Sequence, residues 1–214
     1  RLYNENLEQM VAQRTGQISQ TNEQLRNEIA DREQAEAALR QERNLLRTMI
    51  DHLPEFIYVK DPQSRFLLAN RACVHSLGQT SLDKLLGKTD ADLFPAQEAD
   101  DFYRAEQEVL SSGQPFINRE ETCTNLLTGE PMWLLTSKVP FRDAEGHIIG
   151  LVGLSLDITG RKQAQEEFRK LSRAVEYSAN SIIMTDLTGA IEFVNPAFTT
   201  TTGYPFEEIF GKNP

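Results

Sequence analysis

The chain has 214 residues, 39% of them hydrophobic, and a formal net charge of −10. Residues 1–50 hold seven Arg against eight Asp and Glu, so most of the acidic excess falls in residues 51–214. With no basic stripe in that acidic part, we expect no nucleic-acid partner. No apolar run approaches the roughly 20 residues that cross a bilayer. We therefore expect a cytoplasmic location for this stretch, which leaves open a parent protein anchored in the inner membrane.

Residues 1–50 predict one long helix, because they contain a single Gly and no Pro. One column of apolar residues recurs at a stride of seven, with one arginine in between. These residues are Val11, Ile18, Leu25, Leu39 and Leu46. Because this spacing is typical of a coiled-coil seam, we expect a homodimer through this helix. The companion heptad column is mostly polar, so a solvated single helix remains the alternative.

From about residue 54 the apolar period changes from that of a helix to that of strands. The expected strands are 55–60, 65–69, 115–123, 131–141 and 147–157. Between the second and third strands we expect a short helix capped by Asn70, short helices near 81–86 and 91–94, and a longer helix over 96–111. This order predicts an α+β domain: an antiparallel five-stranded sheet with helices on one face. We place its boundaries at residues 51–160.

The chain repeats itself at an offset of 125 residues. Asp61, Asn70 and Gly78 align with Asp186, Asn195 and Gly203. A long-period repeat indicates tandem copies of one structural unit. We therefore expect a helical linker over 161–177 and the start of a second unit over 178–214. By the offset, about 70 residues of that unit would follow residue 214, so we expect the chain to be a piece of a longer protein.

Several short motifs resemble landmarks of the PAS sensor fold. They are Asn70-Arg71-Ala72, Gly87-Lys88, Asp92-Leu93-Phe94-Pro95, Lys138-Val139-Pro140 and Asp157-Ile158-Thr159-Gly160-Arg161. The resemblance implies a sensory or dimerisation module of a bacterial signal-transduction protein, upstream of a histidine kinase or a diguanylate cyclase. No nucleophile–base set or phosphate loop is visible, so we expect any catalytic output domain to lie outside this chain. A structural spacer that binds no ligand is the alternative.

The end of the last strand is the predicted site of signal relay. The Asp157 carboxylate within reach of Arg161 would tie the strand to the next helix, and Thr159 would cap the turn. The alternative is a plain surface salt bridge of less than about 1 kcal/mol.

We predict a pocket between the sheet and the helices, suited to a small metabolite. Its expected lining is Tyr58, Phe102, Val109, Trp133 and Leu135. An aromatic stripe of this kind also suits a closed core, so that alternative stays open.

We expect no metal site and no cofactor in the first unit. The two cysteines have no metal-ligand spacing. Haem-binding PAS proteins take their iron ligand mostly from the long helix, and residues 96–111 contain no His. Cys73 and Cys123 do not match the reactive cysteine motif of flavin-binding photoreceptors. The resemblance leaves flavin open for a complete second unit.

Overall fold

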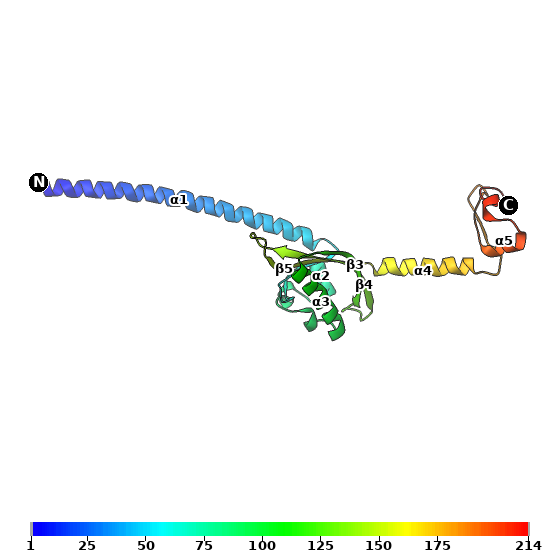
Figure 1. The fold of residues 1–214 in the computed structure, drawn as a ribbon. Helices are drawn as coiled ribbons and strands as arrows, with labels where there is room; N and C mark the ends of the chain where they lie inside the picture. The colour runs from blue at the N-terminus through cyan, green and yellow to red at the C-terminus, as the bar shows by residue number, and fades with distance from the viewer. Residues whose placement is uncertain (1, 214) are drawn as a thin grey trace.

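The computed structural model describes residues 2–213, apart from the side chains of residues 2–9, 11, 12 and 19. A long helix, an α+β domain, a second helix and a small C-terminal unit follow one another along the chain (Figure 1). The two long helices leave the α+β domain on opposite sides (Figure 1). Over the described residues, no helix has the length and apolar character needed to cross a membrane.

Helix α1 (Leu2–Asp51) is continuous through the single glycine, Gly16. The apolar column predicted as a dimer seam faces solvent along this helix. The exposed fractions of Ile18, Leu25, Leu39 and Leu46 lie between 49% and 59%. The side chain of Val11 lies outside the described residues. Pairing of this column with a second chain therefore stays a prediction.

Five antiparallel strands form the expected sheet, in the order β2-β1-β5-β4-β3. Their bounds are β1 Phe56–Lys60, β2 Phe66–Ala69, β3 Phe116–Thr124, β4 Pro131–Arg142 and β5 Ile148–Asp157. A turn at Asp143–Gly146 joins β4 to β5, with the Asp143 N–H donating to the His147 carbonyl. The predicted sheet is thus confirmed, with strand ends that differ by about one residue.

The helices that come after β2 and before β3 in the sequence cover one face of the sheet (Figure 1). They are α2 (Arg71–Ser76), the 3₁₀ turns η1 (Leu82–Lys84) and η2 (Asp90–Asp92), and α3 (Ala96–Ser112). Gly113 ends α3 at a φ of 67°, a left-handed conformation that glycine adopts without steric cost. Apolar side chains of β2, α2 and the following turn pack into a buried core, made of Phe66, Ala69, Cys73, Val74, Leu77 and Leu85. The α+β class is therefore confirmed.

Asn70 joins the entry helix to the domain through one buried side chain. Its Oδ1 accepts from the Cys73 N–H at 3.0 Å, the predicted N-cap, and from the Ile57 N–H at 3.1 Å. Its Nδ2 donates to carbonyl oxygens of Ile50 and Glu55, both at 2.8 Å. The end of α1, strand β1 and helix α2 therefore meet at a single amide group.

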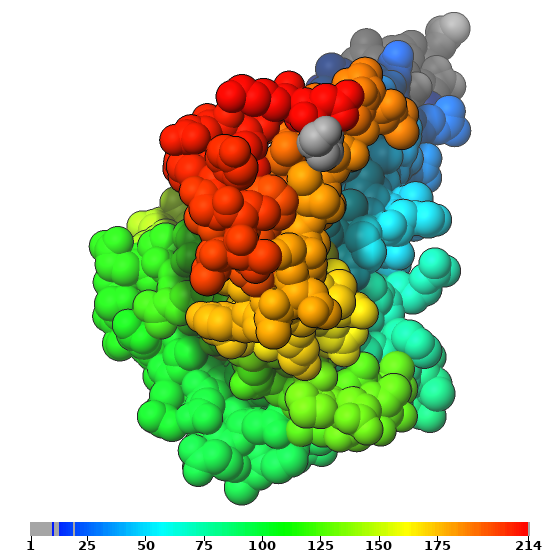
Figure 2. Space-filling model, turned by 90° about the vertical axis from the view of Figure 1, so that its right-hand side faces the viewer, coloured from blue at the N-terminus to red at the C-terminus, as the bar shows by residue number. Residues whose placement is uncertain are grey.

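The second unit repeats this amide junction. Helix α4 (Thr159–Glu176) leads into β6 (Ile183–Thr185), β7 (Ile191–Val194), α5 (Pro196–Thr202) and α6 (Phe206–Ile209). Asn195 accepts from the Ile182 and Phe198 N–H groups and donates to the carbonyls of Val175 and Asn180. Each partner lies 125 residues after its counterpart around Asn70. Figure 2 shows this unit as one body at the end of α4.

Substituting Asn70→Ala should lower the free energy of unfolding of the first unit by about 3 kcal/mol, since it leaves several buried backbone groups unpaired. Urea unfolding followed by the fluorescence of Trp133, the single tryptophan, would measure the change. Asn44→Ala, at an exposed position on α1, is the matched control and should change little. Equal stability of the two variants would contradict the role of Asn70.

Candidate functional site

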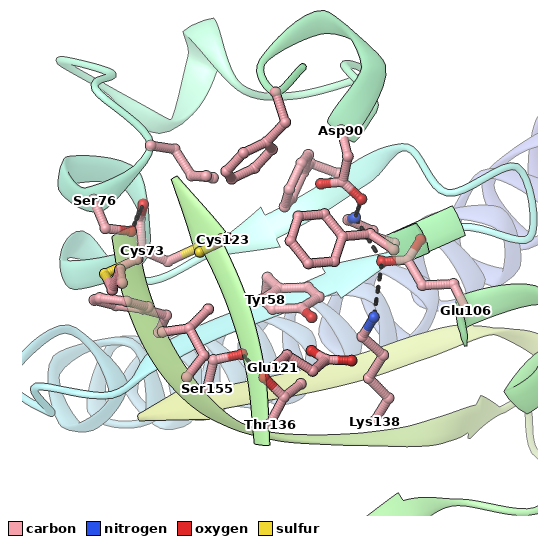
Figure 3. A pocket seen from close by; sticks show the side chains of 18 of the residues that line it. Tyr58, Cys73, Ser76, Asp90, Glu106, Glu121, Cys123, Thr136, Lys138 and Ser155 are labelled. Carbon is pink, nitrogen blue, oxygen red and sulfur yellow. Dashed lines mark hydrogen bonds and ion pairs between the residues drawn. The ribbon is translucent and has the colours of Figure 1, made fainter. Parts of the chain in front are cut away.

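A cavity lies between the sheet and its helical cover, within the first unit. Side chains from β1, β3, β4, β5, α2 and α3 line it (Figure 3). About 60 Å³ of the cavity is open to the centre of a water-sized sphere.

Charged side chains gather at one end of the cavity. Lys60 on β1 forms ion pairs with Asp90 on η2 and with Glu106 on α3, the second at 2.6 Å. Lys138 on β4 lies 4.0 Å from the same Glu106 oxygen (Figure 3). The side chains of Lys60, Glu106 and Lys138 are only 1–2% exposed. Buried charges of this kind are stable only when they are paired and hydrogen-bonded.

The two lysines differ in how well they are compensated. Burial lowers the pKa of Lys60, but the charges of Glu106 and Asp90 outweigh that effect and raise the pKa above 10.5 overall. For Lys138, burial dominates and lowers the pKa below 10.5, because the charges of Glu106 and Glu121 offset only part of the desolvation. Lys60 is therefore a paired structural cation, whereas Lys138 is a poorly compensated amine.

Two polar atoms at this end have no hydrogen-bond partner among the described residues. They are Lys138 Nζ and Glu106 Oε2, both fully buried. Tyr58 lines the cavity beside them, and burial, followed by the charges of Glu106 and Asp90, holds its pKa well above 10. Its hydroxyl therefore stays protonated and can donate a hydrogen bond. This end of the cavity can bind a polar group.

The other end is apolar. Phe94 and Phe102 pack edge to face at 5.2 Å between ring centroids, next to Met132 and Leu134. Burial raises the pKa of the Cys73 thiol to about 12. Burial raises the pKa of the Cys123 thiol to about 12 as well. Both thiols stay protonated at neutral pH and act as small apolar groups.

Gly153 gives Tyr58 its place in the cavity wall. Tyr58 on β1 pairs directly with Gly153 on β5. A Cβ at Gly153 would lie 2.1 Å from the Tyr58 ring. The ring therefore occupies the space that the side chain of any other residue at position 153 would need.

The structure places only part of the predicted lining on this cavity. Tyr58 and Phe102 line it. Val109 is buried at 1% exposure but lies outside the lining. Trp133 and Leu135 point to the opposite face of the sheet, because successive residues of β4 alternate and Met132, Leu134, Thr136 and Lys138 face inward.

Sequence reasoning missed the polar residues of the cavity. They are Lys60, Asp90, Glu106, Glu121, Thr136, Lys138 and Ser155. The Thr136 and Ser155 hydroxyls bond to each other at 3.0 Å. Lys60 could have been found, because it lies two residues after Tyr58 on the same face of the strand.

The exit from the sheet differs from the expected Asp157–Arg161 pair. Asp157 accepts instead from the Thr159 N–H at 2.8 Å. Arg161 lies 3.6 Å from Glu120 on β3. Thr159 Oγ1 accepts from the Trp133 N–H at 2.9 Å, and the Ile158 N–H donates to the Trp133 carbonyl. The start of α4 is therefore joined to β4 by one backbone bond and by one bond through the Thr159 hydroxyl, while Arg161 pairs with Glu120.

The first unit is thus an α+β domain in which helices cover one face of an antiparallel sheet and enclose a cavity. A family model described as PAS fold matches residues 50–163, and one described as PAS domain matches residues 179–214. The first match alone covers more than half of the chain, which therefore belongs to the PAS family. The resemblance found in the sequence is confirmed.

The relatives of this chain include signalling proteins. It is 35% identical over 133 residues to the methanogenesis regulatory histidine kinase FilI of Methanothrix harundinacea, covering 62% of this chain and 15% of FilI. It is 34% identical over 159 residues to the virulence sensor protein BvgS of Bordetella pertussis, covering 71% of this chain and 12% of BvgS. The solved BvgS PAS domain has 29% identity and a TM-score of 0.47, with 63% of this chain and 98% of that domain covered.

Lys60→Met and Lys138→Met should differ strongly in their effect on the free energy of unfolding. The first strands two buried carboxylates and should cost about 3–5 kcal/mol. The second removes a poorly compensated cation and should cost less than about 1 kcal/mol, or stabilise. Urea unfolding at pH 7 measures both, and each variant serves as the other's control.

The pH dependence follows from the lowered pKa of Lys138. Between that pKa and 10.5 the unfolded chain binds more protons than the folded chain, so stability rises with pH. The wild type should therefore gain stability relative to Lys138→Met as the pH rises toward 10.5. A difference that stays constant, or changes the other way, would contradict this assignment.

Proposed function

We propose that this chain is the sensory and relay part of a signal-transduction protein. Its first PAS unit binds a small molecule in the cavity, and α4 carries the resulting change toward the second unit. The observation that carries the proposal is the pair of buried polar atoms on the cavity wall, Lys138 Nζ and Glu106 Oε2, that lack a partner among the described residues. Native proteins rarely leave such atoms unsatisfied.

The relay is supported by how α4 is attached at its two ends. At its start, Ile158 and Thr159 bond to both backbone groups of Trp133 on β4. At its end, the Val175 carbonyl accepts from Asn195 of the second unit. Since β4 also carries Lys138 and Thr136 on the cavity, a shift of this strand would move the start of α4.

We propose that the output is enzymatic and resides in other domains of a cytoplasmic part of the parent protein. FilI and BvgS are named as a histidine kinase and a sensor protein, and a diguanylate cyclase of Vibrio cholerae is 26% identical over 132 residues. The matched part of the chain spans 41% of that cyclase and far less of FilI and BvgS.

Native mass spectrometry with hydrogen exchange would separate a sensor from a ligand-free spacer. A sensor should retain a small molecule from a cell extract, and the bound form should exchange more slowly at Trp133 and in the first turn of α4. A clean apo mass, with no change in exchange or thermal stability across a metabolite library, would overturn the proposal in favour of the spacer.

We propose also that two chains pair through α1. Four residues of the seam, Ile18, Leu25, Leu39 and Leu46, expose their apolar side chains. Trp133, Leu154 and Leu156 on the uncovered face of the sheet are exposed as well. A second copy of the helix would bury the seam and gain about 25 cal/mol for each Å² of apolar surface. The polar companion column keeps this pairing weak, which suits a switchable dimer.

The double substitution Leu25→Lys and Leu39→Lys should weaken the dimer by at least tenfold. It places two positive charges from each chain in the apolar contact between the helices. Sedimentation equilibrium at tens of micromolar measures the dissociation constant. Asn27→Lys and Gln41→Lys add the same charge on the opposite face of α1 and are the matched control. A wild-type monomer at these concentrations, or equal effects of the two pairs, would contradict dimerisation through this seam.

A further inference from the structure

The two unpaired atoms in the cavity form a donor and an acceptor that cannot satisfy each other. Lys138 Nζ lies 4.0 Å from Glu106 Oε1, which is too far for a hydrogen bond. That oxygen already accepts from Lys60 at 2.6 Å. Glu106 Oε2 and Lys138 Nζ are both buried, and neither has a hydrogen-bond partner among the described groups. A third group that accepts from Nζ and donates to Oε2 would satisfy both atoms.

The charges around these atoms disfavour a charged ligand. Asp90, Glu106 and Glu121 line the cavity, and the Lys60 ammonium is already shared by two of these carboxylates. An anionic ligand could pair with Lys138, but it would also lie near Glu106 and Glu121, and the three carboxylates of the lining already outnumber its two lysines. A cationic ligand would offer Lys138 no acceptor and would lie near the Lys60 ammonium. An uncharged head group avoids both costs, and it loses less hydration on entering the cavity.

The cavity wall next to Lys138 is apolar, and this determines which kind of group the rest of the ligand can be. Lys138 Nζ lies 5.5 Å from the centroid of the Phe102 ring, and Phe94, Met132 and Leu134 continue the apolar surface from there. Figure 3 shows Glu106 and Lys138 at one end of the cavity, Cys73 and Cys123 toward the other, and Tyr58 between them. The space of about 60 Å³ suits a body of few atoms.

We infer that the cavity selects a small uncharged molecule with a hydrogen-bond donor and acceptor on one head group, such as a primary amide or an alcohol, attached to a short apolar body. This inference rests on the proposed sensory function. The head group accepts from Lys138 Nζ and donates to Glu106 Oε2. The apolar body lies against Phe102 and Phe94. Tyr58 supplies a further donor to the acceptor side of the head group.

Four probes of nearly equal shape test the inference on the full chain: isobutyramide, isobutyrate, isobutylamine and the zwitterion α-aminoisobutyrate. Titration followed through the methyl resonance of Met132, which lines the cavity, gives each dissociation constant. We expect isobutyramide to bind at least about tenfold more tightly than any charged probe, because only the amide pairs both atoms without bringing a charge. Tighter binding of any charged probe would overturn the inference.

Two variants locate the effect. Lys138→Met removes the donor at similar length and should weaken amide binding by about tenfold or more. Lys162→Met removes an ammonium that pairs with Glu120 at the start of α4, outside the cavity, and should leave amide binding unchanged. Equal binding by wild type and Lys138→Met would overturn the inference. The comparison of the four probes on the wild type decides the ligand class even if that variant fails to fold.

Failure of this inference is distinguishable from failure of the proposed function. If a charged probe binds best, the cavity still senses a small molecule and only the ligand class is wrong. If none of the probes binds while native mass spectrometry shows a retained metabolite, the ligand class is again wrong. If none binds and the protein is recovered only as a clean apo mass, both the inference and the sensory function fail.

Discussion

The ion pairs of Lys60 hold the helical layer over the sheet. One side chain on β1 reaches Asp90 in η2 and Glu106 in α3, so three segments far apart in sequence meet at one ammonium group. A pair of this kind contributes little net stability compared with apolar packing, but the loss of one partner is costly. It therefore fixes where the helices lie more than how strongly they are held. The cavity, its polar end and the unpaired oxygen of Glu106 all follow from that position.

The fold was predictable because its signals are local and agree with one another. Turn residues such as Asp143 and Gly146, the cap at Asn70 and the glycine after α3 mark element ends within one or two residues. The 125-residue repeat added an independent check, since Asn195 makes the same contacts as Asn70. The short helices expected near 81–86 and 91–94 are present as the 3₁₀ turns η1 and η2.

The site was only partly predictable, and strand parity explains the gap. Tyr58 was placed on the cavity, and period two would have placed Lys60 there too. Helical spacing likewise puts Glu106 between Phe102 and Val109. Lysine and glutamate are almost never fully buried unless they are paired, so residue type alone assigns Lys60 and Glu106 to the surface. In β4 the sequence does not tell which alternate residues face the cavity. The uncovered face carries the apolar Trp133 and Leu135, while the inward face carries Thr136 and Lys138. No composition rule predicts a lysine inside.

Helix α4 is fixed at both ends, to β4 by Thr159 and to the second unit by Val175. At about 1.5 Å and 100° per residue, the count of residues between those points sets both the separation of the two anchor points, about 24 Å, and their angular phase. One residue added or removed would turn the second anchor by roughly a quarter of a revolution, whereas seven would nearly restore it. The relative orientation of the two units is thus encoded as a number of residues. An insertion or deletion in α4 would therefore change that orientation even if every side-chain contact at its two ends were kept.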